Sequence, residues 1–155
     1  MRIIFLGLLY SDNLIKNRKR YSKGGLQMAP HTFQSNLIQG FKAKGEKVRV
    51  LNVTPIGSFP INSKKLFITK ENWGEDNLQI SYINLPIVKR LMQKCVIKRE
   101  IKKIIEKNKN EEISIIAYGT YIPFLEILNY FKEKHPSIKN SIIVTDCVPG
   151  REDMD

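Results

Sequence analysis

The chain has 155 residues, of which 42% are hydrophobic, and a formal net charge of +11 at pH 7. This length suits a single domain with a buried core, and the ordinary hydrophobic fraction argues against disorder. Its apolar runs all fall short of the roughly 18 residues that a membrane-spanning helix needs. The positive charge favours an anionic partner such as nucleic acid, an acidic lipid surface or a phosphorylated ligand.

The first segment, residues 2–9, is a continuous apolar run. Such a run predicts a strand buried on both faces of a parallel sheet, because both of its sides must then be apolar. It is short for the apolar part of a signal peptide and lacks a small-residue cleavage site, so we expect a cytoplasmic protein. A polar and basic loop is expected over residues 10–27, and it ends near the glycine pair Gly24-Gly25.

A helix is expected from Pro30, since proline suits the first turn of a helix, where its missing N–H costs nothing. Residues 47–53 alternate polar and apolar side chains and predict a second strand, so that residues 1–53 form a strand–helix–strand unit. Apolar residues recur at helical spacing up to Gly45, which is well placed to end the helix: Phe33, Leu37, Ile38 and Phe41.

Residues 66–70 and 78–84 flank the turn-like sequence NWGED, which predicts a small hairpin or an edge strand. A long helix is expected from Pro86 to Lys107, where apolar residues again recur at helical spacing. Beyond it, residues 113–119 form another apolar run and predict a buried strand.

The last part of the chain predicts a helix with Pro123 in its first turn, and then a strand over residues 141–146. Strands and helices that alternate in this way indicate an open α/β sheet. The expected fold is therefore a single Rossmann-like domain over residues 1–155, with three layers and a mostly parallel sheet.

The segment 89–109 concentrates the positive charge, with nine Lys or Arg against Glu100 and Glu106. An anionic membrane surface would attract it by roughly 1 kcal/mol per basic residue near the lipid. Nucleic acid is disfavoured, because no recognised RNA or DNA module accompanies the charge. A solvated helix face is the remaining alternative.

In an open α/β sheet, ligands bind at the carboxyl ends of the strands, close to the point where the strand order reverses. Gly24 and Gly25 end the loop after the first strand, just ahead of a helix N-terminus. Free amides and the helix dipole there favour an anion such as a nucleotide phosphate, although a flexible turn explains the pair equally well. His31 follows in the first helical turn, where it would face a ligand or simply be solvated.

Two later strands are followed by polar residues. Tyr118, Gly119 and Thr120 come after one of them, and Gly119 and Thr120 would equally cap the next helix. Thr145 and Asp146 come after the last strand. The carboxylate of Asp146 is well placed to accept a proton or a substrate hydroxyl, although an aspartate at a strand end often only starts a turn.

Several chemistries lack their motifs. Gly7 stands alone without G-x-G-x-x-G, and G-x-x-x-x-G-K-[ST] is absent, which disfavours NAD binding and P-loop chemistry. Cys95 and Cys147 lack paired-ligand spacing, and with only two histidines in the chain we expect free thiols, no metal site and no cofactor.

Five segments carry a family resemblance: RIIFLGLL, KGGLQMAP, FKAKGEKVRVLNV, AYGTYIPFLEILNYFKEKHP and IIVTDCVPG. In this order they resemble the N-terminal half of a two-domain glycosyltransferase of the GT-B type, which uses a nucleotide sugar and retains its anomeric configuration. The shared features are a glycine pair before the first helix, GxKVxVL after it, and an apolar strand that runs into a polar residue and proline.

This resemblance implies a domain that mainly binds the acceptor, with Gly24 and Gly25 in the glycine loop that faces the sugar phosphate. Thr145-Asp146 falls where many members have a His-Asp pair, so Asp146 is left as the candidate base on that strand. Those transferases hold the nucleotide sugar in a C-terminal domain with two spaced glutamates. No such domain follows Asp155, so we expect this chain to be an excised half that is inactive alone.

The expected function is therefore the acceptor side of sugar transfer from a nucleotide-sugar donor to a polysaccharide or glycolipid acceptor, at the inner membrane face. The alternative is a non-catalytic, anion-binding α/β module that its basic helix recruits to nucleic acid or acidic lipid. A flavodoxin-like or response-regulator-like domain fits less well, because Asp12 stands alone where an acidic cluster should follow the first strand.

Overall fold

The computed structural model describes residues 1–17, 22–23, 25–74 and 76–145. The strands in chain order are β1 (Arg2–Gly7), β2 (Lys47–Asn52), β3 (Phe67–Ile68), β4 (Glu71–Trp73), β5 (Asn77–Gln79), β6 (Tyr82–Ile83), β7 (Ile113–Tyr118) and β8 (Lys139–Ile143). The helices are α1 (Asp12–Lys16), α3 (Met28–Ala43), α4 (Pro86–Lys107) and α5 (Ile122–Lys134).

The main sheet has six strands in the order β4-β5-β2-β1-β7-β8, and β3 pairs with β6 in a separate ribbon. All neighbouring pairs from β5 to β8 are parallel, whereas β4 pairs antiparallel with β5 at one edge. The chain thus builds outward from β1 in one direction through β2 and β5, and in the other through β7 and β8. The strand order reverses between β1 and β7.

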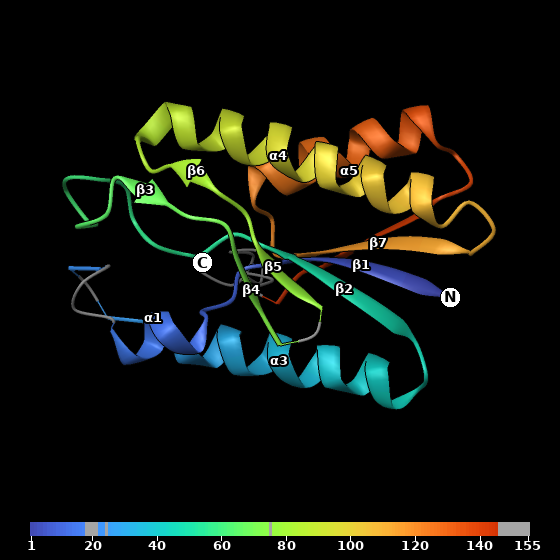
Figure 1. Cartoon of the computed structure of the whole chain (residues 1–155), viewed down its shortest axis with the longest axis horizontal. Coiled ribbons are helices and arrows are strands. Elements are labelled where there is room, and N and C mark those ends of the chain that lie inside the picture. The colour runs from blue at the N-terminus through green and yellow to red at the C-terminus, as the bar shows by residue number, and fades with distance from the viewer. Residues whose placement is uncertain (18–21, 24, 75, 146–155) are drawn as a thin grey trace, which may run out of the picture.

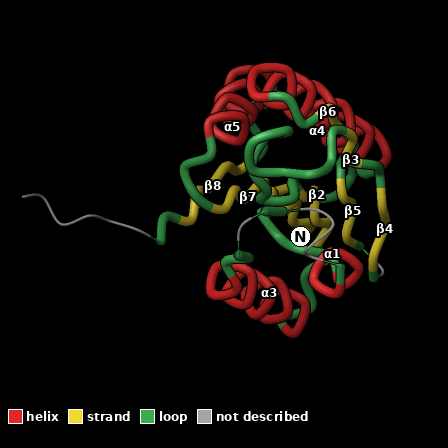
Figure 2. Tube along the Cα trace, turned by 90° about the vertical axis from the view of Figure 1, so that its left-hand side faces the viewer, coloured by secondary structure: helices red, strands yellow, loops and turns green. Residues whose placement is uncertain are grey.

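Helices cover both faces of this sheet (Figure 1). α1 and α3 lie against one face, and α4 and α5 lie side by side on the other, as the end-on view also shows (Figure 2). The predicted α/β class and the mostly parallel sheet are therefore confirmed. No helix in the described part of the chain is long and apolar enough to cross a bilayer.

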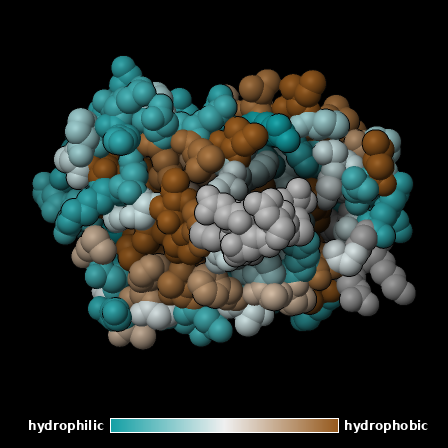
Figure 3. Space-filling view, turned by 180° about the vertical axis from the view of Figure 1, so that it is seen from behind, coloured by the Kyte–Doolittle hydropathy of each residue, from teal (hydrophilic) through white to brown (hydrophobic). Residues whose placement is uncertain are grey.

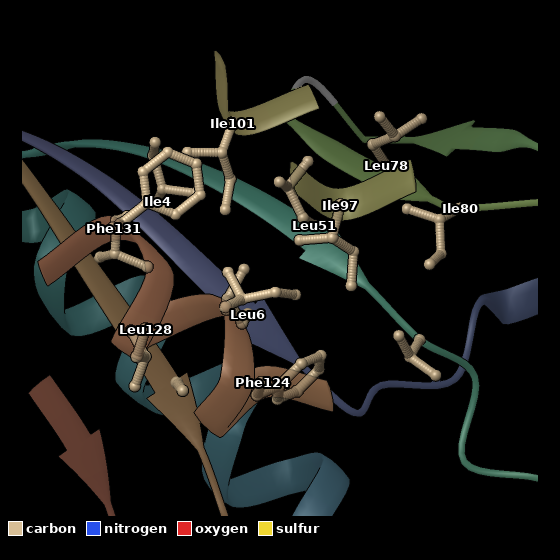
Figure 4. Packing of buried hydrophobic residues seen from close by; sticks show 14 of the residues in the cluster. Ile4, Leu6, Leu51, Leu78, Ile80, Ile97, Ile101, Phe124, Leu128 and Phe131 are labelled. Atoms are coloured by element: carbon tan, nitrogen blue, oxygen red, sulfur yellow. The ribbon is translucent and has the colours of Figure 1, made fainter. Parts of the chain in front are cut away.

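The packing of β1 explains why its sequence is apolar without interruption. Ile4 and Leu6 join the core cluster that includes residues of α4 and α5 (Figure 4), whereas Ile3 and Phe5 join a second cluster that includes Ile38 of α3. Successive residues of a strand point to opposite faces. A strand covered by helices on both faces therefore needs an apolar residue at nearly every position.

Both ends of α3 agree with the prediction. Pro30 lies in the first turn of α3. Gly45 follows the last turn with a φ of +80°, and its N–H donates to the carbonyl of Lys42. A positive φ of this kind strains residues that have a Cβ, so glycine suits the position.

The predicted loop over residues 10–27 is wrong in one part, because it contains the short helix α1. Ser11 starts this helix, and its hydroxyl accepts a hydrogen bond from the N–H of Leu14 at 3.3 Å. The Leu14 side chain is buried in the core. A helix of five residues with one cap and one buried leucine has no repeat of apolar residues, so its sequence does not show the helical period.

The middle of the chain forms two nested hairpins. β3 and β6 pair antiparallel, as predicted for residues 66–70 and 78–84, and β4 and β5 pair antiparallel inside them. β5 also joins the main sheet parallel to β2. The final strand was expected over residues 141–146 but spans Lys139–Ile143, because its register with β7 begins at the Ser114–Lys139 pair.

Ile97 and Leu91 give a matched test of this packing. Both lie on α4, but Ile97 is fully buried whereas Leu91 is 55% exposed. We expect Ile97→Ala to lower the free energy of unfolding by about 2–5 kcal/mol, because it leaves a cavity in the core. Leu91→Ala should change it by less than about 0.5 kcal/mol. Urea unfolding followed by circular dichroism measures both values, and equal losses would contradict the packing.

Candidate functional site

The candidate site lies at the carboxyl edge of the sheet, where β1 and β7 end beside each other. Figure 2 turns the left-hand side of Figure 1 to the viewer and so looks onto this edge. The loops after β1 and β7 leave the sheet here in opposite directions. α3 and α5 begin at this same edge, so their first turns flank it.

Three successive backbone amides in the loop after β1 donate to side chains of the same domain. The N–H of Leu8 donates to Gln34 Oε1 at 2.8 Å, and the N–H of Leu9 donates to Asn52 Oδ1 at 2.6 Å. The N–H of Tyr10 donates to His31 Nδ1 at 3.2 Å. Side chains of α3 and β2 therefore already occupy the amides that would otherwise be available to an anion.

Asn52 extends this arrangement into a buried polar network. Its Nδ2 donates to the carbonyl of Leu9 at 2.9 Å and to Gln79 Oε1 at 2.8 Å. The hydroxyl of Thr54 donates to the same oxygen of Gln79, and the hydroxyl of Tyr82 donates to the carbonyl of Thr54 at 3.2 Å. These side chains are all buried and uncharged. Burial also raises the pKa of Tyr82, which keeps its hydroxyl neutral.

A second buried polar contact lies under α4. The hydroxyl of Tyr121 donates to Oε1 of the buried Gln93 at 2.5 Å. Burial raises the pKa of Tyr121, although the positive charge of Arg90 opposes this shift. The hydroxyls of Tyr82 and Tyr121 are thus neutral hydrogen-bond donors, like the backbone amides of the β1 loop.

His31 is a titratable side chain of α3 that contacts the β1 loop. Because its Nδ1 accepts the N–H of Tyr10, the neutral ring must carry its proton on Nε2. Partial burial lowers the pKa of His31 below the usual 6.5, and the negative charge of Asp12 opposes that shift. Among the residues that the structure describes, Nε2 has no hydrogen-bond partner, so it remains a donor for a ligand.

The structure brings Tyr118 and Thr145 together. Their hydroxyl oxygens lie 3.4 Å apart, and the Tyr118 ring lies 6.0 Å from the ring of Phe33. Thr145 is exposed, and Phe33 is 47% exposed. Phe33 was expected in the apolar face of its helix. It instead offers an aromatic surface at the edge, because it lies on the exposed side of α3, whereas the next residue, Gln34, is fully buried.

Gly119 turns the chain between β7 and α5. Its φ is +74°, and its N–H donates to the carbonyl of Ile143 at 2.9 Å, which joins this turn to the end of β8. Thr120 is exposed and does not cap the helix: the N-cap is Tyr121, and its side chain makes no capping bond. The alternative capping role of Thr120 is therefore wrong.

Of the glycine pair, the structure describes Gly25 only. Gly25 is exposed, and a Cβ added to it would meet nothing within 4 Å. The fold itself therefore does not require glycine at this position, and the space beside it is open. Gly24 and Asp146 lie outside the described residues.

Seen from the side of β8, a hydrophobic band crosses the middle of the molecule (Figure 3). Two exposed apolar side chains belong to this side, Ile142 of β8 and Val144 just beyond it. Cys95 is a free, exposed thiol on α4, and Cys147 lies outside the described residues. Within the described ranges, no group of three or more His, Cys, Asp or Glu side chains is placed to hold a metal ion.

Comparison of the chain with family models, with curated proteins and with solved structures finds no match. The chemistry of the edge must therefore be judged from its own residues. Its inner side chains are neutral amides and hydroxyls together with the buried Tyr118, and its outer ones are the Phe33 ring, threonine hydroxyls and an imidazole N–H. Such groups suit a ligand with many hydroxyls better than a multiply charged one.

Removal of the Asn52 amide tests the buried network. We expect Asn52→Ala to lower the free energy of unfolding by about 2–4 kcal/mol, because both backbone groups of Leu9 and the Gln79 side chain would lose partners in the interior. Asn36→Ala on the exposed side of α3 is the control and should cause no loss. Urea unfolding gives both values, and amide hydrogen exchange should show faster exchange at Leu9 in the first variant only.

The bond between His31 and Tyr10 makes stability depend on pH. Since the pKa of His31 is lower in the folded state, the unfolded chain binds more protons, and stability should fall as the pH drops below about 6.5 towards the folded pKa. His31→Asn keeps an acceptor near Nδ1 but cannot be protonated. It should reduce this slope in urea unfolding curves measured at several pH values. A slope unchanged in that variant would show that other groups cause it.

Proposed function

We propose that the chain is the acceptor-binding half of a nucleotide-sugar-dependent glycosyltransferase. In this proposal its domain is Rossmann-like and supplies one half of a GT-B architecture. The strand order supports the Rossmann-like assignment, because it runs outward from β1 on both sides, as in doubly wound sheets. The five-segment resemblance supports the family.

One observation carries the acceptor role: the β1 loop has no amide among Leu8, Leu9 and Tyr10 left for an anion. A loop that cradles phosphates needs such N–H groups to point at the ligand. Here His31, Gln34 and Asn52 accept them instead. The edge thus favours an uncharged saccharide, which is what the acceptor half of a transferase must hold.

The outer residues of the edge match the chemistry of a sugar. Pyranose rings present hydroxyls that donate and accept hydrogen bonds, and C–H faces that pack on aromatic rings. The exposed ring of Phe33 would contact such a face, whereas the Tyr118 ring packs in the core beside it. The hydroxyls of Thr120 and Thr145 and the Nε2–H of His31 would contact the sugar hydroxyls.

The catalytic role proposed for Asp146 follows from its position directly after Thr145. Its carboxylate would orient the reacting hydroxyl of the acceptor or take its proton. Gly24 and Gly25 would let the donor's sugar phosphate approach the start of α3. The nucleotide and the leaving diphosphate would need cationic groups of a second domain.

The acceptor in this proposal is a polysaccharide or a glycolipid at the inner membrane face, where the basic segment 89–109 would favour anionic lipid. The second candidate function is a non-catalytic module that binds nucleic acid or acidic lipid. It is favoured by an open hollow of about 510 Å³ on the outer side of α4. Four cations line that hollow: Lys98, Arg99, Lys102 and Lys103.

Sugar transfer by the native protein tests the proposal. Protein isolated from its own cells would be incubated with a panel of radiolabelled nucleotide sugars and the cell's own lipid and polysaccharide fractions. We expect label in one of these fractions. Asp146→Asn should lower kcat by about 10²–10⁴-fold. Tyr118→Phe should raise the KM for the acceptor, because this variant loses only the hydroxyl group that would contact the acceptor.

Lys44→Gln, at an exposed position after α3, is the matched control and should leave transfer unchanged. A folded protein that transfers no sugar from any donor would refute the proposal. Tight binding of short duplexes, with affinity that falls steeply as salt rises, would then favour the non-catalytic module.

A further inference from the structure

The first turns of α4 and α5 expose large apolar side chains to solvent. Ile87 is 77% exposed, Leu91 55% and Ile122 52%. Together with Pro86 and Pro123 they line a groove of about 380 Å³ between the two helices. Single exposed apolar residues are common, but three adjacent ones at the rim of one groove indicate an interaction surface.

Charged side chains surround this groove. Arg90 and Lys94 line it, and Lys94 forms an ion pair with Glu126 at 2.7 Å. Arg90 has no ion-pair partner in the described ranges, and neither does Arg99, further along α4. The groove therefore combines an exposed apolar rim with a cation, Arg90, that no ion pair neutralises among the described residues.

The outer face of α4 continues from this apolar end into the basic hollow lined by Lys98, Arg99, Lys102 and Lys103. Residues three or four apart share one face of a helix, so Ile87, Leu91, Lys98 and Lys102 follow one another along it. One helix thus presents an apolar end and a cationic end on the same side.

The charges decide which partner fits this surface. A second copy of the chain would place the same cations against each other, which is unfavourable in a symmetric contact. Nucleic acid would match the cations but leave Ile87, Leu91 and Ile122 in water. A bilayer with acidic headgroups matches both ends, because the apolar side chains reach its acyl region while the cations lie among the phosphates.

We propose that the groove between the first turns of α4 and α5, with the cations along α4, docks the protein on an anionic membrane surface. The apolar contact comes from Ile87, Leu91 and Ile122, two of which lie outside the basic segment 89–109. The charge contact comes mainly from Arg90 and Arg99, since Lys98 lies 3.3 Å from the Tyr130 ring and Lys103 pairs with Glu100 at 3.1 Å.

This surface also fixes an orientation. α4 and α5 begin at the same edge of the sheet at which β1 and β7 end (Figure 1). Docking by their first turns would turn the edge with Tyr118 and Thr145 towards the headgroups. A lipid-linked acceptor could then reach that edge without leaving the bilayer. This consequence rests on the proposed function, whereas the docking itself does not.

Vesicle co-sedimentation of the full chain tests the docking, with phosphatidylcholine vesicles that contain or lack phosphatidylglycerol. We expect binding to the acidic vesicles only. Ile87→Ser with Leu91→Ser should weaken it by roughly tenfold, because apolar area no longer leaves water. Arg90→Gln with Arg99→Gln should weaken it by about fivefold for each charge removed.

Two controls match these variants. Ile142→Ser removes an apolar side chain that is 46% exposed on β8, and Lys44→Gln removes an exposed charge beyond α3. Both should bind acidic vesicles like the unchanged protein. As an independent readout, Leu91→Trp should add tryptophan emission that shifts to shorter wavelength with acidic vesicles, because the ring enters an apolar medium.

The opposite results would overturn the proposal. Loss of binding in the arginine variant but not in the serine variant would mean that charge alone attracts the protein. A concentration-dependent dimer that the serine variant abolishes, without vesicle binding, would assign the groove to a second copy. Vesicle binding as expected, in a native protein that transfers no sugar, would support the docking and refute only the proposed function.

Discussion

The amide of Asn52 is the contact on which the carboxyl edge of this sheet depends. It accepts from and donates to the backbone of Leu9, and it donates to Gln79, so that one side chain at the end of β2 joins the loop after β1 to β5. All of its partners lie in the interior, where an unpaired polar group is costly. These bonds therefore hold the loop after β1 against the ends of β2 and β5.

The elements of this fold that could be predicted are those that their own residues mark in the sequence. Uninterrupted apolar runs gave β1 and β7, and Pro30 and Gly45 marked the ends of α3. β5 could not be predicted as a member of the main sheet, because its three residues owe their place to pairing with β2. A pairing partner distant in sequence leaves no periodic pattern.

The candidate site was predictable in outline only. Tyr118 ends β7 and Thr145 lies just after β8, so the general rule for open sheets brings them together, and the structure does so. Gln34 and Asn52 carried no such signal, because their role depends on loop amides that lie 26 and 43 residues away in sequence. Phe33 had the spacing of a core residue, and only the structure shows that its ring is exposed.

The position of β1 between β2 and β7 also has a consequence for synthesis of the protein. The register pairs Arg2 with Lys47 on one side and with Ile113 on the other. At roughly 5–20 residues per second, the ribosome needs on the order of ten seconds after β1 to deliver β7. During that time β1 can pair on one side only, and its other edge is an apolar, unpaired strand that neighbouring chains could join. The nascent chain therefore passes through a stage at which a chaperone that covers strand edges would protect it most.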